Sequence, residues 1–197
     1  MISKDLQEKI EKSKKALRLS CEMAKEFYDK PLILCYSGGK DSDVLLHLAE
    51  NCLKPDDFIV QHSLTTVDAP PTVRHIKEQF KRLEEKGIQT QIDYHEYTDE
   101  NGVKRRHTMW NMIPEKGIAP TRLARWCCSM FKEMSTPNAI ACLGVRGGES
   151  TKRRGRDIFG VRGGSYRTAT FFHSTTQRKY LKKVNLVTLC GIVNLSR

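Results

Sequence analysis

The chain has 197 residues, of which 39% are hydrophobic and 29% are charged, a composition typical of a globular protein and not of a disordered one. Its longest apolar runs span only a few residues and its first residues are charged, so we expect neither a transmembrane helix nor a signal peptide. The seven cysteines show no disulfide-type spacing, which favours reduced thiols and a cytoplasmic protein.

Hydrophobic spacing predicts that helices and strands alternate along the chain. We expect helices at 4–29 and 42–53, a third that follows a polar loop with Pro70-Pro71 and runs to about Lys86, a short one near 109–113, and one at 121–134. We expect strands at 32–36, 58–60, 88–94 and 139–145, with turns elsewhere in 95–120 and one further apolar run at 184–193. This alternation predicts an α/β fold, a mostly parallel doubly wound sheet with helices on both faces.

The positive charge is concentrated in the last quarter of the chain. The whole sequence has a net charge of +11, and residues 151–197 hold eleven Lys and Arg against one acid, Asp157. We therefore expect a nearly neutral domain over residues 1–150 and a basic C-terminal extension over residues 151–197. The extension is either a patch for a phosphorylated partner or a nucleic acid, or an incomplete piece exposed by truncation.

A glycine-rich turn joins the first predicted strand to the next helix. It consists of Ser37, Gly38, Gly39, Lys40, Asp41 and Ser42. The glycines let the backbone approach an anion, and a helix N-terminus offers unpaired N–H groups and the positive end of its dipole. Lys40 adds a positive charge, and Asp41 suits a role in orienting Lys40 or a Mg²⁺ carried by a nucleotide. The alternative is an ordinary glycine turn with a polar cap.

More polar residues are expected at the carboxyl edge of the sheet, where open α/β proteins bind ligands. Thr65, Thr66 and Asp68 follow the second predicted strand, where they either contact a ribose or base or simply form a turn.

Three arginines are candidates for an anion site. Arg122 and Arg125 are three residues apart, which places them on one face of the predicted helix, and Arg146 follows the fourth predicted strand. Guanidinium groups in these places could bind sulfate or phosphate oxygens in pairs of hydrogen bonds. The alternative is that they are solvated surface side chains.

Three segments together resemble one protein family. The turn at 37–42 resembles the PP-loop of the adenine-nucleotide α-hydrolase-like superfamily. Residues 120–128, with their Trp-Cys-Cys sequence, the later Lys132, and residues 144–150 are similar to segments of the phosphoadenosine phosphosulfate (PAPS) and adenosine phosphosulfate (APS) reductases. The resemblance covers about residues 30–156.

The resemblance implies an adenine-nucleotide α-hydrolase-like fold, ATP, APS or PAPS as the ligand, with or without Mg²⁺, and a role in sulfur metabolism. It implies that the turn at 37–42 holds phosphates and that Arg122, Arg125 and Arg146 clamp the anion. Glu149 would orient an arginine, and Ser150 would belong to the same substrate site. Thioredoxin or glutaredoxin would be the reductant.

The sequence also departs from that family. Its usual Asp-Thr-Gly and Pro-Glu-Thr after the second strand are reduced here to Thr65, Pro70 and Thr72. The C-terminal Glu-Cys-Gly-x-His motif, whose cysteine attacks sulfur, is missing, and Cys190 lacks the flanking Glu and His. Because reduction needs a thiolate nucleophile, we expect that this chain does not reduce PAPS or APS with thioredoxin at the rates of the family.

The adjacent Cys127 and Cys128 have two interpretations. In APS-type reductases such a pair, with a later Cys-x-x-Cys, holds a [4Fe–4S] cluster. This chain has no Cys-x-x-Cys, and Cys142 and Cys190 lack ligand spacing, so two ordinary helix cysteines are the competing interpretation.

Three functions remain open from the sequence. The first is a PAPS or APS reductase-like enzyme, and the second is nucleotide activation with pyrophosphate release, as in the ATP pyrophosphatases and sulfurtransferases that share the loop. The third is a non-catalytic nucleic-acid-binding or regulatory protein that uses the basic extension.

Overall fold

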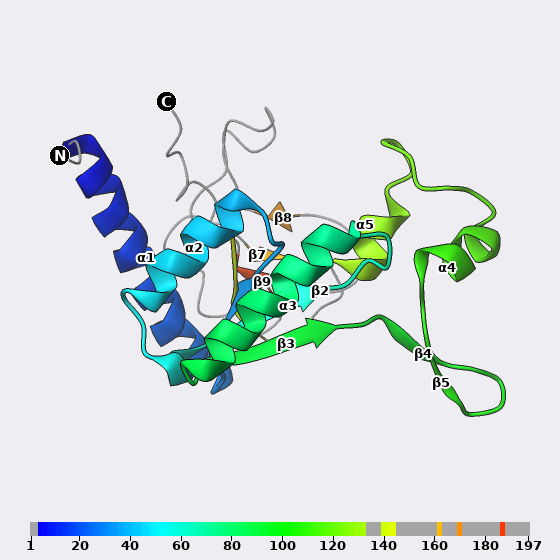
Figure 1. Cartoon of the computed structure of the whole chain (residues 1–197), viewed down its shortest axis with the longest axis horizontal. Coiled ribbons are helices and arrows are strands. Elements are labelled where there is room, and N and C mark those ends of the chain that lie inside the picture. Colours follow the sequence, from blue (N-terminus) through cyan, green and yellow to red (C-terminus); the bar gives the residue numbers. More distant parts are fainter. Residues whose placement is uncertain (1–3, 133–138, 145–160, 163–168, 171–185, 188–197) are drawn as a thin grey trace.

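The computed structural model of the chain describes residues 4–132, 139–144, 161–162, 169–170 and 186–187. Its first part alternates helices and strands as the hydrophobic spacing predicts (Figure 1). The elements are α1 (Lys4–Tyr28), β1 (Leu32–Cys35), α2 (Lys40–Glu50), the 3-10 helix η1 (Pro55–Asp57), β2 (Phe58–Ser63), α3 (Pro70–Glu85) and β3 (Gln89–Asp93).

Four parallel strands form the central sheet in the order β3-β2-β1-β6, where β6 is Ala141–Leu143. Leu34 of β1 lies opposite Val60 of β2 on one side and Cys142 of β6 on the other. Because the strands are parallel, their carboxyl ends meet at one edge of the sheet. The predicted α/β fold, a mostly parallel sheet flanked by helices, is confirmed.

The main hydrophobic core is formed by residues of this sheet and of the long helices α1, α2 and α3. Leu17 of α1, Leu45 of α2 and Leu83 of α3 are completely buried there, opposite Leu34 of β1. These leucines come from the apolar stripes that predicted the helices. A smaller cluster of Ile33, Ala139 and Ala141 covers the other side of the strands.

Residues 94–125 form an arm that extends beyond the end of β3 (Figure 1). The arm contains the hairpin of β4 (Glu96–Thr98) and β5 (Lys104–Arg106), followed by α4 (Met109–Lys116). Asp99 closes the hairpin by accepting hydrogen bonds from the N–H groups of Asn101 and Val103. The predicted turn and the short helix are therefore present, whereas the two strands of the hairpin were not predicted.

The helix predicted over 121–134 is wrong in its first part, because α5 spans only Trp126–Phe131. Thr121 and Ala124 instead form a local turn, in which Thr121 N–H donates to the Ala124 carbonyl and Ala124 N–H donates to the Thr121 hydroxyl. Arg122 lies in this turn and Arg125 is the residue before α5, so the two arginines do not share a helix face.

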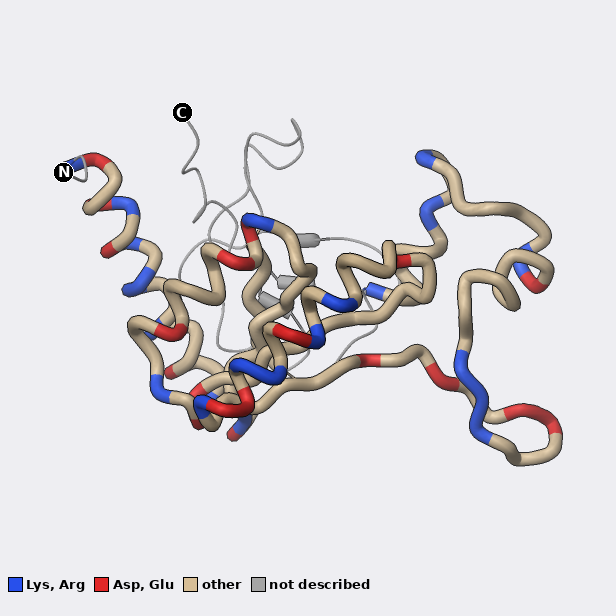
Figure 2. The backbone as a smooth tube through the Cα atoms, in the orientation of Figure 1, with Lys and Arg blue, Asp and Glu red and all other residues tan. Residues whose placement is uncertain are grey.

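Basic and acidic residues are interspersed along the described body of the molecule (Figure 2). Beyond residue 150 the structure describes three two-residue strands, β7 (Val161–Arg162), β8 (Ala169–Thr170) and β9 (Leu186–Val187), in an antiparallel sheet of order β8-β7-β9. The division at residue 150 therefore stays a prediction. Within the described ranges, no helix combines the length and the apolar character needed to cross a membrane.

Candidate functional site

The glycine-rich loop lies between the end of β1 and the start of α2, at the carboxyl edge of the sheet. Gly38 has a positive φ of 72°, a left-handed conformation that favours glycine. A Cβ added at Gly38 would also lie 2.9 Å from Cγ1 of Ile76 on α3. Both the backbone conformation and the close packing against α3 therefore require glycine at this position.

Helix α2 begins two residues earlier than predicted, at Lys40, with Gly39 as its N-cap. The first N–H groups of an α-helix have no carbonyl partner within the helix, so they are available to an anion. The Ser42 hydroxyl is occupied inside the loop: it donates to the Gly39 carbonyl at 2.7 Å and accepts from the Gly39 N–H at 3.1 Å. Ser37 donates to the same hydroxyl at 3.2 Å. The two serines therefore fix the shape of the loop.

The end of β6 approaches the same loop. A Cβ added at Gly144 would lie 2.7 Å from the carbonyl oxygen of Asp41 and 3.2 Å from the Ser42 nitrogen. This close approach brings the start of the segment that contains Arg146 against the first turn of α2. Arg146, Glu149 and Ser150 themselves lie outside the described residues.

The residues after β2 are bonded within the protein. The N–H and the hydroxyl of Thr65 both donate to Oδ2 of Asp68, at 2.9 and 2.7 Å. Thr66 has a positive φ of 65°, and its hydroxyl accepts from the N–H of Met109, the first residue of α4. Thr65, Thr66 and Asp68 therefore shape the edge of the sheet and anchor the arm to it.

A polar cluster that the sequence analysis missed lies directly beside the loop. Tyr36, the last residue before Ser37, is 2% exposed, and its hydroxyl donates to Oδ1 of Asp43 at 2.5 Å. Nε2 of His75 lies 3.2 Å from the same hydroxyl. Burial raises the pKa of Tyr36, and the hydrogen bond to Asp43 raises it further. The only sequence signal for this cluster is that His75 precedes Ile76, a residue of the buried stripe of α3.

His62 on β2 fixes the backbone at the same point. Its side chain is buried, and Nδ1 lies 2.9 Å from the Tyr36 carbonyl oxygen. A carbonyl can only accept, so Nδ1 carries the hydrogen and Nε2 is an acceptor when the ring is neutral. Among the described residues Nε2 of His62 has no hydrogen-bond partner.

The described cysteines do not fit a [4Fe–4S] cluster. Cys142 is completely buried in β6, as expected from its place in the sequence, and burial raises its pKa well above the ordinary value. Burial and the neighbouring Cys128 raise the pKa of Cys127, and the Arg125 guanidinium donates to the Cys128 sulfur at 3.7 Å. Within the described part of the chain, no group of three or more His, Cys, Asp or Glu residues could hold a metal ion. A cluster needs four such ligands.

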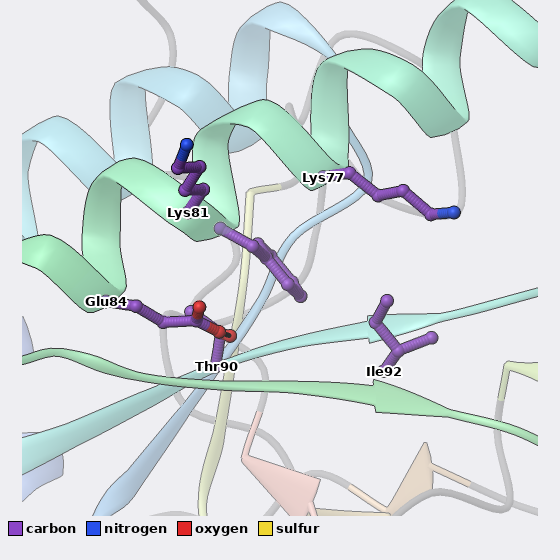
Figure 3. Close-up of a pocket in the computed structure, with 6 residues that line it drawn as sticks. Lys77, Lys81, Glu84, Thr90 and Ile92 are labelled. Carbon is purple, nitrogen blue, oxygen red and sulfur yellow. Dashed lines mark hydrogen bonds between the residues drawn. The ribbon is translucent and has the colours of Figure 1, made fainter.

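A groove of about 320 Å³ lies between α3 and the edge strand β3 (Figure 3). It is lined by Lys77, Phe80, Lys81, Glu84, Thr90 and Ile92, and the Thr90 hydroxyl donates to Glu84. None of these residues belongs to the glycine-rich loop, so the groove is separate from the predicted site.

The parallel sheet with its helices, and the glycine-rich loop after β1, define the chain as an α/β protein. A family model, the phosphoadenosine phosphosulfate reductase domain, matches residues 31–172. Because this match covers more than half of the sequence, the chain belongs to the phosphoadenosine phosphosulfate reductase family, a family of nucleotide-binding enzymes.

Among solved structures, the chain is similar to the NH3-dependent NAD synthetase from Campylobacter jejuni subsp. jejuni NCTC 11168, in complex with the nitrate ion. The sequence identity is 13% and the TM-score is 0.43, and the match covers 74% of this chain. The chain spans 62% of the length of that synthetase. A comparison with curated proteins gives no match.

Proposed function

We propose that the chain is a PAPS or APS reductase-like enzyme that binds an adenine nucleotide or sulfonucleotide through its PP-loop, in sulfur metabolism in the cytoplasm. The observation that carries this proposal is the loop itself: Gly38 in a left-handed conformation, pressed against Ile76, at the start of α2. That geometry places the open N–H groups of a helix at the carboxyl edge of a parallel sheet.

We assign each group of residues a separate role in binding the nucleotide. The first N–H groups of α2 and the exposed Lys40 would hold the phosphates, with Mg²⁺ carried by the nucleotide where it is ATP. Ser37 and Ser42 keep the loop in shape through their mutual hydrogen bond. The approach of Gly144 to Asp41 supports a role for the segment of Arg146, Glu149 and Ser150 in the same site.

Arg122 and Arg125 would contact the sulfate or phosphate from the chain before α5. Both side chains are exposed, so they are accessible to an anion. Arg125 also donates to the Cys128 sulfur, which links this part of the proposed site to the cysteine pair. The two arginines act from a turn and a helix start and not from one helix face.

Nucleotide activation with release of pyrophosphate is the second candidate, and five of the six described cysteines favour it. Reduction of a sulfonucleotide with thioredoxin or glutaredoxin as partner requires a thiolate in the site. Burial raises the pKa of Cys21, Cys35, Cys52, Cys127 and Cys142, which keeps these thiols protonated near neutral pH. Activation of a nucleotide with release of pyrophosphate needs no thiolate.

The test is a calorimetric binding screen with ATP, APS, PAPS and 3′,5′-ADP, followed by assays of sulfite release from APS or PAPS and of pyrophosphate release from ATP where these bind. Binding of one of these nucleotides supports the proposal, and pyrophosphate release without sulfite supports the second candidate. Sulfite release that is lost in Cys190→Ser would show that this thiol performs the reduction. If only single-stranded DNA or RNA binds, with an affinity that falls steeply with salt, the chain is a nucleic-acid-binding protein.

A further inference from the structure

The side chains of Tyr36 after β1, Asp43 on α2 and His75 on α3 form a hydrogen-bonded chain beside the PP-loop. A carboxylate can only accept hydrogen bonds, and a tyrosine hydroxyl carries a single hydrogen. Tyr36 therefore donates to Asp43, so it must accept from His75, whose Nε2 carries a hydrogen. The order is His75 Nε2–H to Tyr36 O–H to the Asp43 carboxylate.

Tyr36 is held at each of its polar groups. Its N–H donates to the Gln61 carbonyl at 2.7 Å, its carbonyl accepts from His62, and its hydroxyl lies in the chain just described. Its ring lies 6.2 Å from that of Phe80, measured between centroids. Tyr36, the residue just before the PP-loop, therefore has little freedom to move away from Asp43 and His75.

The elements of this chain also form the wall of the loop. His75 precedes Ile76, whose side chain packs against Gly38, and Thr72, one turn earlier on α3, contacts the same glycine position. Asp43 belongs to the first turns of α2, because its N–H donates to the Gly39 carbonyl at 3.0 Å. A change in charge at His75 or Asp43 therefore takes place next to the proposed phosphate site.

The charges in this cluster respond to an anionic ligand. The Asp43 carboxylate repels phosphates on the same helix end, and a positive His75 would offset that repulsion. His75 and Asp43 side chains are 41% and 46% exposed and their Nε2 and Oδ1 atoms are 3.9 Å apart, so solvent protons reach the imidazole. The added proton occupies Nδ1 and leaves the bond from Nε2 to Tyr36 intact. The other charged group that acts on Tyr36 is Arg82 of α3.

We infer that nucleotide binding at the PP-loop is coupled to protonation of His75, with Tyr36 and Asp43 as the positioning residues that link this proton to the loop. This inference rests on the proposed function, since it concerns the same site. Imidazole is the side chain whose charge changes in the neutral pH range. By linkage, uptake of up to one proton on binding weakens affinity as pH rises, by about tenfold per pH unit at most.

The test is calorimetric titration of the full chain in buffers with different ionisation enthalpies, using each of ATP, APS, PAPS and 3′,5′-ADP that binds. We expect proton uptake in the unmodified chain at pH 7 and a large loss of it in His75→Gln and Tyr36→Phe. His47→Gln is the matched control, because His47 lies at the other end of α2 and bonds only to Asn51.

Asp43→Asn separates this coupling from a merely structural role. Asparagine still accepts from Tyr36 but removes the negative charge, so we expect tighter binding than in the unmodified chain at pH 8 and little change in affinity with pH. Binding without proton uptake, or uptake that persists in His75→Gln, would overturn the inference. If none of the four nucleotides binds, the proposed function is wrong and the inference fails with it.

Discussion

Gly38 is the residue at which a single added carbon tests the shape of the loop. Its φ of 72° and the 2.9 Å contact that a Cβ would make with Ile76 both act against a side chain. We expect Gly38→Ala to lower the free energy of unfolding by more than the roughly 1–2 kcal/mol that a left-handed backbone costs a non-glycine residue. Urea denaturation measures this change.

The matched control is Gly117→Ala. Gly117 follows α4 with a φ of 65°, but no atom lies within 4 Å of the position of its Cβ. The Gly117→Ala variant therefore measures only the loss of stability that the left-handed backbone conformation causes. Equal losses in the two variants would show that Ile76 does not press against the loop.

The cysteines should differ in reactivity according to their burial. Cys142 is completely buried, which raises the pKa of its thiol well above the ordinary value, so this thiol stays protonated at pH 8, where a thiolate is needed for alkylation. We expect iodoacetamide at pH 8 to modify the native protein at the half-buried Cys127 or Cys128 and to spare Cys142. Peptide mass spectrometry identifies the modified sites. Modification of Cys142 in the native state would contradict its burial in β6.

The sequence predicted the place of the glycine loop between β1 and α2, because two glycines between an apolar run and a helical pattern indicate a turn. It did not predict Tyr36, Asp43 and His75 as a cluster, since their contacts join β1, α2 and α3 across 39 positions in the chain. It also placed Arg122 and Arg125 on a helix that begins only at Trp126. Local hydrogen bonds of Thr121 determined that outcome, and hydrophobic spacing carries no information about them.

At the scale of elements, the long helices and buried strands follow from periodicity. Each of the helices α1, α2 and α3 buries one apolar face in the core, so the spacing of the apolar residues in the sequence predicts which face packs against the sheet. The residues of the hairpin of β4 and β5 are mostly exposed, so the sequence there has no apolar pattern that would predict the strands. For this reason the arm could be predicted only as turns around a short helix.

An ion-pair group on Glu50 joins the end of α2 to α3. Burial pushes the pKa of Glu50 up, but its contacts with Lys86 at 2.8 Å and Arg82 at 3.2 Å outweigh that effect and lower it. A lowered folded-state pKa gives stability that is present above the unfolded value, about 4.3, and is lost as pH falls through the folded value. Glu50→Gln should therefore destabilise the protein at pH 7, by less than about 1 kcal/mol because the basic partners are exposed.

The pH dependence checks this assignment. Thermal or urea unfolding of Glu50→Gln at pH 7 and pH 3 should show a difference from the unmodified chain that shrinks at the lower pH. Glu78→Gln is the control, since Glu78 is exposed on the same helix, α3. A destabilisation of the same size at both pH values would mean that packing, and not charge, holds Glu50 in place.

At the scale of the whole molecule, the proposed site lies where the parallel strands end and where α2, α3 and Gly144 after β6 approach one another. The N–H of Met109 in the arm donates a hydrogen bond to the Thr66 hydroxyl, so the arm and the loop are both attached to this edge of the sheet. Because residues 1–150 are nearly neutral, the proposed site would attract an anion through the local N–H groups and Lys40, and not through the net charge of +11. Mutation of a single lysine in the loop should then matter more than mutation of any distant one.

The most direct measurement is calorimetric titration of ATP, APS, PAPS and 3′,5′-ADP into the unmodified chain and into Lys40→Ala. A charge-assisted contact of about 1.5–3 kcal/mol predicts that affinity falls roughly ten- to a hundred-fold in the variant while unfolding is unchanged. Lys12→Ala, at an exposed position of α1, should bind as the unmodified chain does. Equal affinity of Lys40→Ala and the unmodified chain for each nucleotide that binds would contradict the assignment of the loop as the phosphate site.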